Sequence, residues 1–281
     1  MAGKQVTELD ALPSFTDTSL LPVHNGAGLK KGLLSQLADY LGTKFSNPNL
    51  LINPDFKINQ RGATSYEKQG YSVDRWKIWN VTVTPSANGG ITVKNDKYSD
   101  TGTFLQYLEN ATEGDSTLSC YVTSVSGTVT MVADDNSQVI LKQGLNVVHT
   151  SKSTKTFTIF LNRGTSVTLK WVKLEQGKVA TEFIAPNPAE ELTKCYRFKY
   201  IGKAVLRGRC TANQIFGFTK DLPTKLRTKP TTTFKSKNSY NVNTVDVTLA
   251  EENNAVYLAG TAENTNQTVI DVVLDLDAEI Y

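Results

Sequence analysis

Ser116 comes nearest in this sequence to a hydrolytic nucleophile, because it follows Gly114 and Asp115 in a Gly-Asp-Ser-Thr segment. A nucleophilic serine needs a base within hydrogen-bonding reach and donors that stabilise an oxyanion. The chain holds two histidines, His24 and His149, and neither stands in an Asp-x-x-His arrangement. The segment instead has the form of a turn that leads into an alternating strand. The sequence therefore predicts a structural serine, no catalytic residue and a protein that is not an enzyme.

Metal ligands are as sparse as catalytic bases. The three cysteines, Cys120, Cys195 and Cys210, are far apart and form no Cys-x-x-Cys pair, and their odd number argues against a disulfide framework. Two isolated histidines without clustered cysteines or carboxylates do not complete a transition-metal site. We expect no metal centre, and a buried structural role for Cys120, which stands at an apolar position of an alternating run.

Exposed aromatic rings offer a different chemistry, because a flat ring can stack on the apolar face of a pyranose. The candidates for glycan contact in the first hundred residues are Tyr66, Tyr71, Trp79 and Tyr98. Trp76 shares a strand face with Ile78, so we expect it in the core. Trp79 breaks this alternation and should lie on the opposite face or at a bulge. Packing in the core or between subunits is the alternative role for each ring.

The composition favours a β-rich chain with no nucleic-acid partner. Ser, Thr and Asn are abundant between the apolar positions, which favours strands and turns over helices. The net charge is only +3, and the basic residues are evenly mixed with acidic ones. No apolar run is long enough to cross a bilayer, and the first residues lack the apolar core of a secretory signal. We expect a soluble protein, made in a reducing cytoplasm, that does not insert into membranes.

Short alternating runs between residues 47 and 185 predict a single β-sandwich or jelly roll. The runs are separated by turns rich in Gly, Asn and Asp, at the spacing typical of all-β domains. Pro186-Asn187-Pro188 ends this domain, since two prolines in three residues bar both a continuing helix and a central strand. Residues 189–281 begin with a short helix or an entering strand. Further alternating runs then predict a smaller β-sandwich domain.

Residues 1–46 differ from everything that follows and predict short extended pieces followed by a helix. Four leucines repeat every four residues on one helical face: Leu29, Leu33, Leu37 and Leu41. Gly42 is placed to end this helix. A lone helix of this length is marginal in water, so it should pack on its own β domain or against copies of itself.

Several segments resemble bacteriophage tail fibres and other virion appendages. Leu51–Gly62, followed by Tyr71–Trp76, resembles the opening of their carbohydrate-binding-module-like jelly roll. Trp171–Gly177, continued by Phe183–Arg197, resembles the junction between that jelly roll and a small C-terminal β domain. Leu222–Thr231 and Leu276–Ile280 resemble two elements of that small C-terminal β domain in the fibre proteins. In the first of them, Leu226 stands where methionine is usual.

The resemblance implies a homotrimeric fibre or appendage protein of a tailed bacteriophage, located in the virion and assembled in the host cytoplasm. Residues 1–46 would attach to other virion proteins, residues 47–185 would form the jelly roll, and residues 189–281 would form the tip. The implied function is adhesion to a glycan on the host surface. The alternatives are a head- or collar-attached fibre with an accessory structural role and a glycan-modifying tail enzyme. A secreted bacterial carbohydrate-binding module is disfavoured by the missing signal peptide.

Two further expectations follow from this resemblance. Jelly-roll modules of this kind often hold a structural calcium ion, and Asp55, Asp96 and Asp100 could supply oxygen ligands. In a fibre, the end farthest from the virion meets the cell, so recognition is expected in loops of the tip domain, with Trp79 as the runner-up. The expected tip loops contain Asn213, the segment from Lys235 through Asn238 and Tyr240 to Asn241, and Asn253-Asn254.

Overall fold

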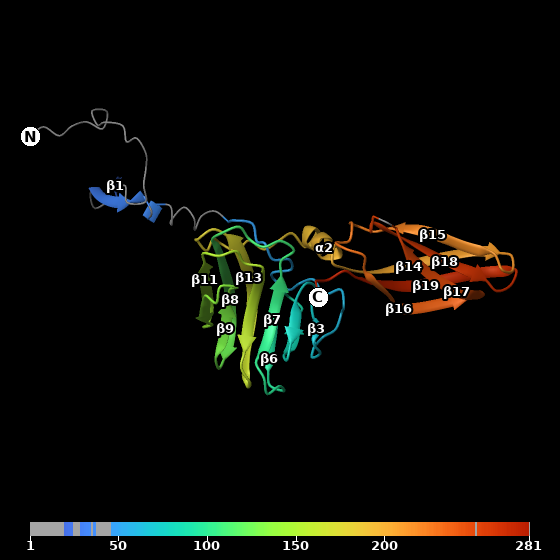
Figure 1. The fold of residues 1–281 in the computed structure, drawn as a ribbon, viewed down its shortest axis with the longest axis horizontal. Coiled ribbons are helices and arrows are strands. Elements are labelled where there is room, and N and C mark those ends of the chain that lie inside the picture. The colour runs from blue at the N-terminus through green and yellow to red at the C-terminus, as the bar shows by residue number, and fades with distance from the viewer. Residues whose placement is uncertain (1–19, 25–28, 35, 38–45, 251, 281) are drawn as a thin grey trace, which may run out of the picture. The chain divides into compact units, whose positions relative to one another are not determined.

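The computed structural model describes residues 20–24, 29–34, 36–37, 46–250 and 252–280, and these form mainly antiparallel strands (Figure 1). The chain divides into two compact units. The first consists of Met1–Asn47 and Val179–Ile184, and the second of Pro48–Lys178 and Ala185–Tyr281. The expected all-β sandwich class is confirmed.

The first unit contains a β-hairpin where the leucine repeat predicts a helix. Strand β1 (Leu20–His24) pairs antiparallel with β2 (Leu29–Leu33). The predicted helix is therefore wrong for Leu29 and Leu33. The Asn25-Gly26 pair between the strands is a strong hairpin signal, and Gly32 would cost about 1 kcal/mol inside a helix. Leu37 lies in a helical turn and Leu41 lies outside the described residues.

The second unit begins with a sandwich of two sheets, the jelly-roll sandwich. One sheet has the order β10-β9-β12-β7-β4-β3 and the other the order β11-β8-β13-β6-β5. The six-stranded sheet consists of β3 (Gly70–Tyr71), β4 (Lys77–Trp79), β7 (Gly102–Tyr107), β9 (Val129–Val132), β10 (Gln138–Ile140) and β12 (Thr156–Leu161). The five-stranded sheet consists of β5 (Thr82–Pro85), β6 (Ile91–Asn95), β8 (Ser116–Ser126), β11 (Gly144–Thr150) and β13 (Thr165–Gln176).

An aromatic cluster fills the space between the two sheets. The Trp76 ring stacks on Phe104 with centroids 4.7 Å apart, and Phe157 meets it edge-on at 5.9 Å. The indole Nε1 donates to the carbonyl oxygen of Asn53 over 2.9 Å, so burial leaves no unpaired polar atom on this ring. The prediction that Trp76 and Ile78 share the core is confirmed. Trp79 points to the opposite face of β4, so no bulge is needed to explain it.

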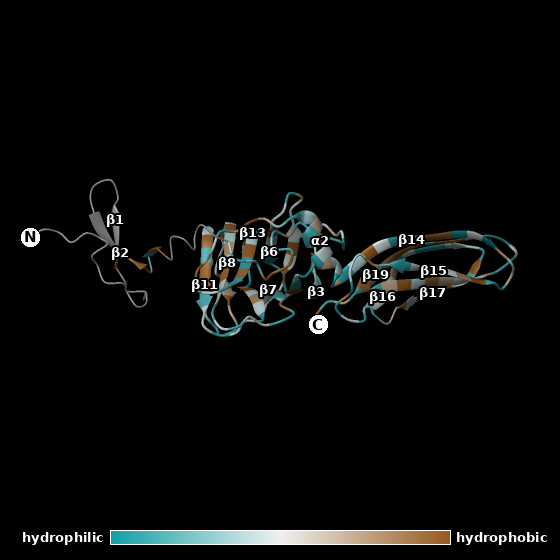
Figure 2. Ribbon diagram, turned by 90° about the horizontal axis from the view of Figure 1, so that it is seen from above, coloured by the Kyte–Doolittle hydropathy of each residue, from teal (hydrophilic) through white to brown (hydrophobic). Residues whose placement is uncertain are grey.

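The C-terminal sandwich follows a helix that the sequence left ambiguous. Asn187 caps α2 (Pro188–Tyr196) by accepting from the Ala189 backbone N–H over 2.9 Å, and Pro188 suits the first helical turn, where no N–H is needed. One sheet has the order β14 (Lys199–Cys210), β19 (Asn266–Asp277), β16 (Thr231–Tyr240). The other has the order β15 (Ile215–Asp221), β18 (Ala255–Ala262), β17 (Val242–Leu249). Figure 2 shows apolar and polar residues alternating along these strands.

The segment from Lys235 to Tyr240 belongs to strand β16, so its prediction as a loop is wrong. It pairs with β19, with a bulge between Phe234 and Ser236. The polar run Lys235-Ser236-Lys237-Asn238-Ser239 has loop-like composition, but an edge strand tolerates polar and charged residues on both faces. The neighbouring Asn241 does lie in a turn, with a positive φ of 57°.

Strand direction separates the predicted tip loops into two groups. The turn at Asn253 lies at the end of the sandwich where β14 begins, because Leu226 N–H donates to the Asn253 oxygen and Arg227 N–H donates to Arg197 just before β14. The turns at Asn213 and Asn241 lie at the opposite end, which we call the distal end. One ligand therefore cannot contact all of these loops together.

Buried charges connect the two sandwiches of the second unit. Arg75 is 1% exposed, and its Nη1 lies 2.5 Å from the carboxylate of Glu279, itself 3% exposed. The Arg75 Nη2 donates to the Tyr107 carbonyl over 2.7 Å, and the guanidinium lies 3.6 Å from the centre of the Phe198 ring. Arg61 Nη2 lies 3.5 Å from the same glutamate. Removing one member would leave the others buried without compensation.

Asp74 lies beside this network and is fully buried. Its carboxylate accepts from the backbone N–H of Gln60 over 2.7 Å and from the Gln60 amide over 2.5 Å, and that amide also donates to the Lys199 carbonyl over 2.7 Å. Desolvation nevertheless raises the pKa of Asp74 to about 6, above the ordinary value of 3.8.

We expect the stability that Asp74 contributes to fall as the pH rises. The folded state holds the Asp74 proton up to about pH 6, whereas the unfolded state loses it near 3.8. The contribution is fully present below pH 3.8 and is lost as the pH rises through about 6, by about 3 kcal/mol in total. Denaturant unfolding of the wild type and of Asp74→Asn from pH 3.5 to 7 measures this. The difference in the free energy of unfolding between wild type and Asp74→Asn should change by that amount over this pH range. A difference that stays constant with pH would contradict the raised pKa of Asp74.

Candidate functional site

The outer face of the six-stranded sheet carries exposed apolar side chains in one cross-strand row. Trp79 on β4 is 47% exposed, Phe160 on β12 is 37% exposed and Ile140 on β10 is 56% exposed. Two threonines alternate with them. Trp79 pairs with Thr103, Phe160 pairs with Thr103 and Thr130, and Ile140 pairs with Thr130. We call these five residues the Trp79 row.

The Trp79 row has the chemistry and length to hold an oligosaccharide. Neighbouring strands are about 4.8 Å apart, so Trp79 and Phe160 are separated by ~10 Å and the whole row spans ~19 Å. A sugar ring combines an apolar C–H face with hydroxyl groups at its rim. The exposed apolar side chains of the row match the C–H face of the sugar. The threonine hydroxyls between them can donate hydrogen bonds to the sugar hydroxyls or accept hydrogen bonds from them.

A depression beside Trp79 adds polar groups to this surface. Its volume is about 310 Å³, and its lining includes Gln69, Lys77, Trp79, Thr103 and Tyr107. The Lys77 ammonium lies 5.6 Å from the centre of the Tyr107 ring and 6.0 Å from that of Tyr71. The aromatic surroundings hold this cation beside Trp79.

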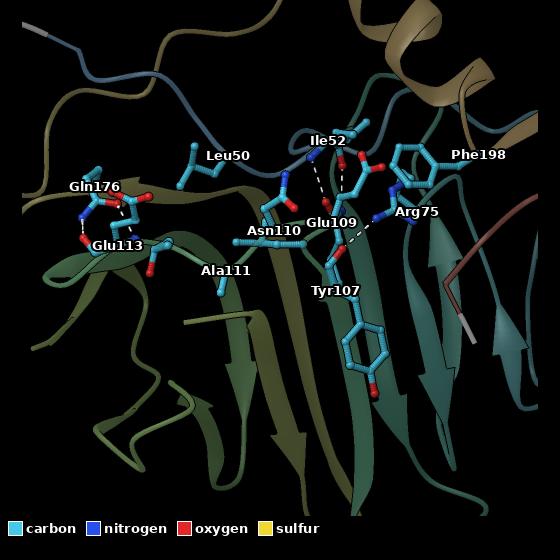
Figure 3. A pocket seen from close by; sticks show the side chains of 13 residues that line it. Leu50, Ile52, Arg75, Tyr107, Glu109, Asn110, Ala111, Glu113, Gln176 and Phe198 are labelled. Atoms are coloured by element: carbon cyan, nitrogen blue, oxygen red, sulfur yellow. Dashed lines mark hydrogen bonds between the residues drawn. The ribbon is translucent and has the colours of Figure 1, made fainter. Parts of the chain in front are cut away.

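A larger cavity lies where β7 ends, and Figure 3 shows it with the residues that line it. Its volume is about 530 Å³, and Leu50, Ile52 and Phe198 supply much of its apolar lining. Most of its polar groups have partners within the protein. The Gln106 amide bonds both the N–H and the carbonyl of Ile52 over 2.8 and 2.7 Å, and Arg75 is held as described above.

Carboxylate and amide groups at the rim of the same cavity are similarly engaged. Glu109 pairs with Arg197 over 2.7 Å, and the Gln176 amide donates to the carbonyls of Glu113 and Asp115. These contacts hold the loop after β7 in place. Most polar groups that line this cavity already bond within the protein and are not available to a ligand. We therefore regard the Trp79 row as the better candidate for the binding site.

The other aromatic candidates of the jelly-roll sandwich make internal contacts. The Tyr66 hydroxyl bonds Asn59, and partial burial raises the pKa of Tyr66 above its ordinary value. The Tyr98 hydroxyl donates to the Glu67 carbonyl over 2.6 Å, and that of Tyr71 donates to the Ile280 carbonyl. Of the four aromatic candidates, Trp79 is the one that presents a largely exposed ring.

The candidates in the C-terminal sandwich do not form one site. The Lys235 ammonium donates to the Arg61 carbonyl over 3.1 Å, which places it against the jelly-roll sandwich. Asn253 lies in a turn at the end where β14 begins, with a positive φ of 58°. Asn238 and Tyr240 are exposed on the outer face of β16, toward the distal end.

The three aspartates considered for calcium are not gathered around a common point. Asp55 pairs with Lys57 over 2.7 Å, and Asp96 and Asp100 are exposed in the loop after β6. Within the described ranges, no group of three or more His, Cys, Asp or Glu side chains is arranged to hold a metal ion.

The Gly-Asp-Ser segment leads into strand β8 of the sandwich, as the sequence predicts. Ser116 is fully buried at the start of β8, where its hydroxyl lies 3.4 Å from that of Thr112. His149 bonds the neighbouring Thr117 hydroxyl over 3.0 Å, on the other face of the strand. Cys120 is also buried, and desolvation raises the pKa of its thiol to about 12, which confirms the expected structural role.

No helix in the described part of the chain has the length and apolar character to span a membrane.

Sequence reasoning missed Phe160 and Ile140 as partners of Trp79. Both carry the same signal as Trp79, an apolar residue at a position of the alternation that should be polar. In Thr156–Leu161 the buried residues are Phe157, Ile159 and Leu161, so Phe160 falls on the outer face. The cross-strand register that aligns these residues depends on pairing between segments far apart in the sequence, which periodicity alone does not give.

Comparison with known proteins leaves the family open. The chain matches no protein-family model, and no curated protein sequence is significantly similar to it. Discoidin II of Dictyostelium discoideum shares 9% identity over 69% of this chain and 83% of its own, with a TM-score of 0.21. A deletion mutant of Bacillus subtilis oxalate decarboxylase shares 10% identity over 83% of this chain and 81% of its own, with a TM-score of 0.13. Structural similarity at such TM-scores supports no inference about fold or function. The β-sandwich class rests on the sheets described above.

Proposed function

We propose that this chain is a glycan-binding adhesion protein of a tailed-bacteriophage fibre or appendage, and that the glycan binds along the Trp79 row. The observation that carries the proposal is the alignment of Trp79, Phe160 and Ile140, alternating with threonines, on one exposed sheet face. The assignment to a virion rests on the resemblance of the sequence to phage fibres.

The amphipathic character of the row favours a sugar over a purely apolar ligand. A fatty chain would leave the threonine hydroxyls facing it unpaired, at a cost in desolvation free energy. An oligosaccharide satisfies both kinds of surface. Binding at each copy would be modest, and several copies on one particle would combine through effective concentration into strong adhesion. The protein would act by binding, without a hydrolytic step.

Adhesion to a panel of bacterial strains tests this function. The labelled full chain should sediment with cells of at least one strain. Periodate, which cleaves the vicinal diols of surface glycans, should abolish this association, and protease treatment of the cells should leave it intact. Association that resists periodate and disappears after protease treatment would indicate a protein receptor and contradict the proposal.

The proposed assembly is a homotrimer attached to other virion proteins through the first unit. Exposed leucines at 20, 33 and 37, with 56%, 37% and 41% exposure, provide an apolar surface there. Light scattering should give about three times the chain mass of 30.9 kDa. Leu33→Asp with Leu37→Asp should weaken assembly or attachment, because each charge would be desolvated on contact. A monomer mass for the wild type at micromolar concentration would contradict the trimer.

A further inference from the structure

Four cations lie on the outer face of β14, but only two of them have carboxylate partners. The Lys199 ammonium lies 2.5 Å from Asp275 and 3.0 Å from Asp277, and that of Lys203 lies 3.0 Å from Asp271. All three aspartates belong to the neighbouring strand β19. Arg61 Nη2 also lies 3.7 Å from Asp277, so three cations face three aspartates and this half of the face is electrically balanced within the protein.

The distal half of the same face is not balanced. Beyond Lys203 the next outward position of β14 holds Val205, and Arg207 and Arg209 occupy the two after it, exposed and opposite Val269 and Gln267. Within the part of the chain that the structure describes, neither guanidinium has a hydrogen bond or an ion pair. Their Cα atoms are about 7 Å apart along the strand, so the two charges repel each other without a nearby anion.

Groups suited to a sugar surround these arginines. The surface is hollowed by about 490 Å³ between Arg207, Gly208, Arg209, Asn266 and Gln267, and the two amide side chains can bond hydroxyl or acetamido groups. Tyr240 on β16 is 59% exposed and lies in the same cross-strand row as Arg207, with Val269 between them. Two strand spacings separate the Tyr240 and Arg207 backbones by about 10 Å, so Tyr240 is within reach of the next sugar along an oligosaccharide.

We propose that Arg207, Arg209, Gln267 and Tyr240 form a second binding site, which takes an oligosaccharide containing a carboxylate-bearing sugar. A guanidinium holds a carboxylate through two parallel hydrogen bonds, which a lysine ammonium cannot reproduce. The exposed tyrosine ring stacks on the adjacent sugar. The site lies at the distal end of the C-terminal sandwich and shares no residue with the Trp79 row.

Calorimetry on the full chain tests the site with oligogalacturonate and oligosialate as probes. Each probe is compared with the same oligosaccharide after reduction of its carboxyl groups. The wild type should bind at least one acidic probe about tenfold more tightly than its reduced form, and Arg207→Gln with Arg209→Gln should remove that difference. Arg207→Lys with Arg209→Lys should show only part of the wild-type preference for the acidic probe. Lysine keeps the positive charge but lacks the planar guanidinium that bonds a carboxylate through two parallel hydrogen bonds.

Two control variants separate this site from general charge and from the Trp79 row. Arg163→Gln with Lys229→Gln lowers the net charge equally at exposed positions elsewhere and should change affinity by less than about twofold. Trp79→Ala should leave binding of the acidic probe unchanged, so failure of either proposed site is visible separately. The second site is overturned if neither acidic probe binds better than its reduced form, if the control pair loses as much affinity, or if double-stranded DNA binds more tightly and with the same arginine dependence.

Discussion

Replacing Glu279 with alanine should lower the free energy of unfolding by about 3–5 kcal/mol. The carboxylate is buried and meets the Arg75 guanidinium, which is itself 1% exposed and packed against Phe198. Without Glu279 the guanidinium keeps the Tyr107 carbonyl as an acceptor but loses its closest negative charge. Urea denaturation, followed by intrinsic fluorescence and circular dichroism, measures the loss.

An exposed pair and a double variant are the controls for this result. Lys97 and Glu67 also form an ion pair, but both side chains are about half exposed, so Glu67→Ala should leave the urea midpoint almost unchanged. Arg75→Met with Glu279→Leu removes both charges and should recover much of the loss. If Glu279→Ala is as stable as the wild type, the ion pair does not hold the junction between the sandwiches.

Truncating the Trp79 row should have the largest effect on function. An exposed tryptophan that anchors a ligand commonly contributes about 2 kcal/mol or more, so Trp79→Ala should weaken glycan binding by roughly thirtyfold. Phe160→Ala should weaken it in the same direction. Because both rings are substantially exposed, neither change should lower the unfolding midpoint much. Cell adsorption and calorimetry with the released glycan measure the two effects.

Tyr121→Ala is the matched control for these truncations. Tyr121 is an aromatic residue with 39% exposure on the outer face of the five-stranded sheet, away from the Trp79 row. Its removal should leave adsorption unchanged. If Trp79→Ala binds normally, and a variant with the segment from Lys235 to Asn241 scrambled does not, recognition lies in the C-terminal sandwich, as the fibre resemblance alone would place it.

Local sequence signals predicted the elements of both sandwiches well, because one face of each strand is buried. The alternation of Ile270, Val272 and Leu274 with Asp271 and Asp275 places the first set in the core and the second outside. The same logic placed Trp76 in the core and Trp79 on the outer face. In each case burial of one face decides the pattern, so periodicity alone is informative.

The sequence-based predictions were wrong where burial of one face does not decide the pattern of apolar and polar residues. Leu29 and Leu33 lie four residues apart, a spacing that fits one helical face and also one face of a strand, and hairpin pairing decided between them. Edge strand β16 has few buried residues, so its polar composition looked like that of a loop. The cross-strand alignment of Phe160 with Trp79, and the missing partners of Arg207, depend on register between distant segments and have no local signal.

Acrylamide quenching of Trp79 fluorescence tests the glycan site most directly. Trp76 is fully buried and Trp79 is 47% exposed, so in a Trp171→Phe background the quencher reaches mainly Trp79. The probe is the oligosaccharide released from the surface of a strain to which the protein adsorbs. Saturation with this probe should lower the quenching constant to near that of the same protein carrying Trp79→Phe. An unchanged quenching constant at saturating oligosaccharide would show that the glycan binds elsewhere and would contradict the proposed site.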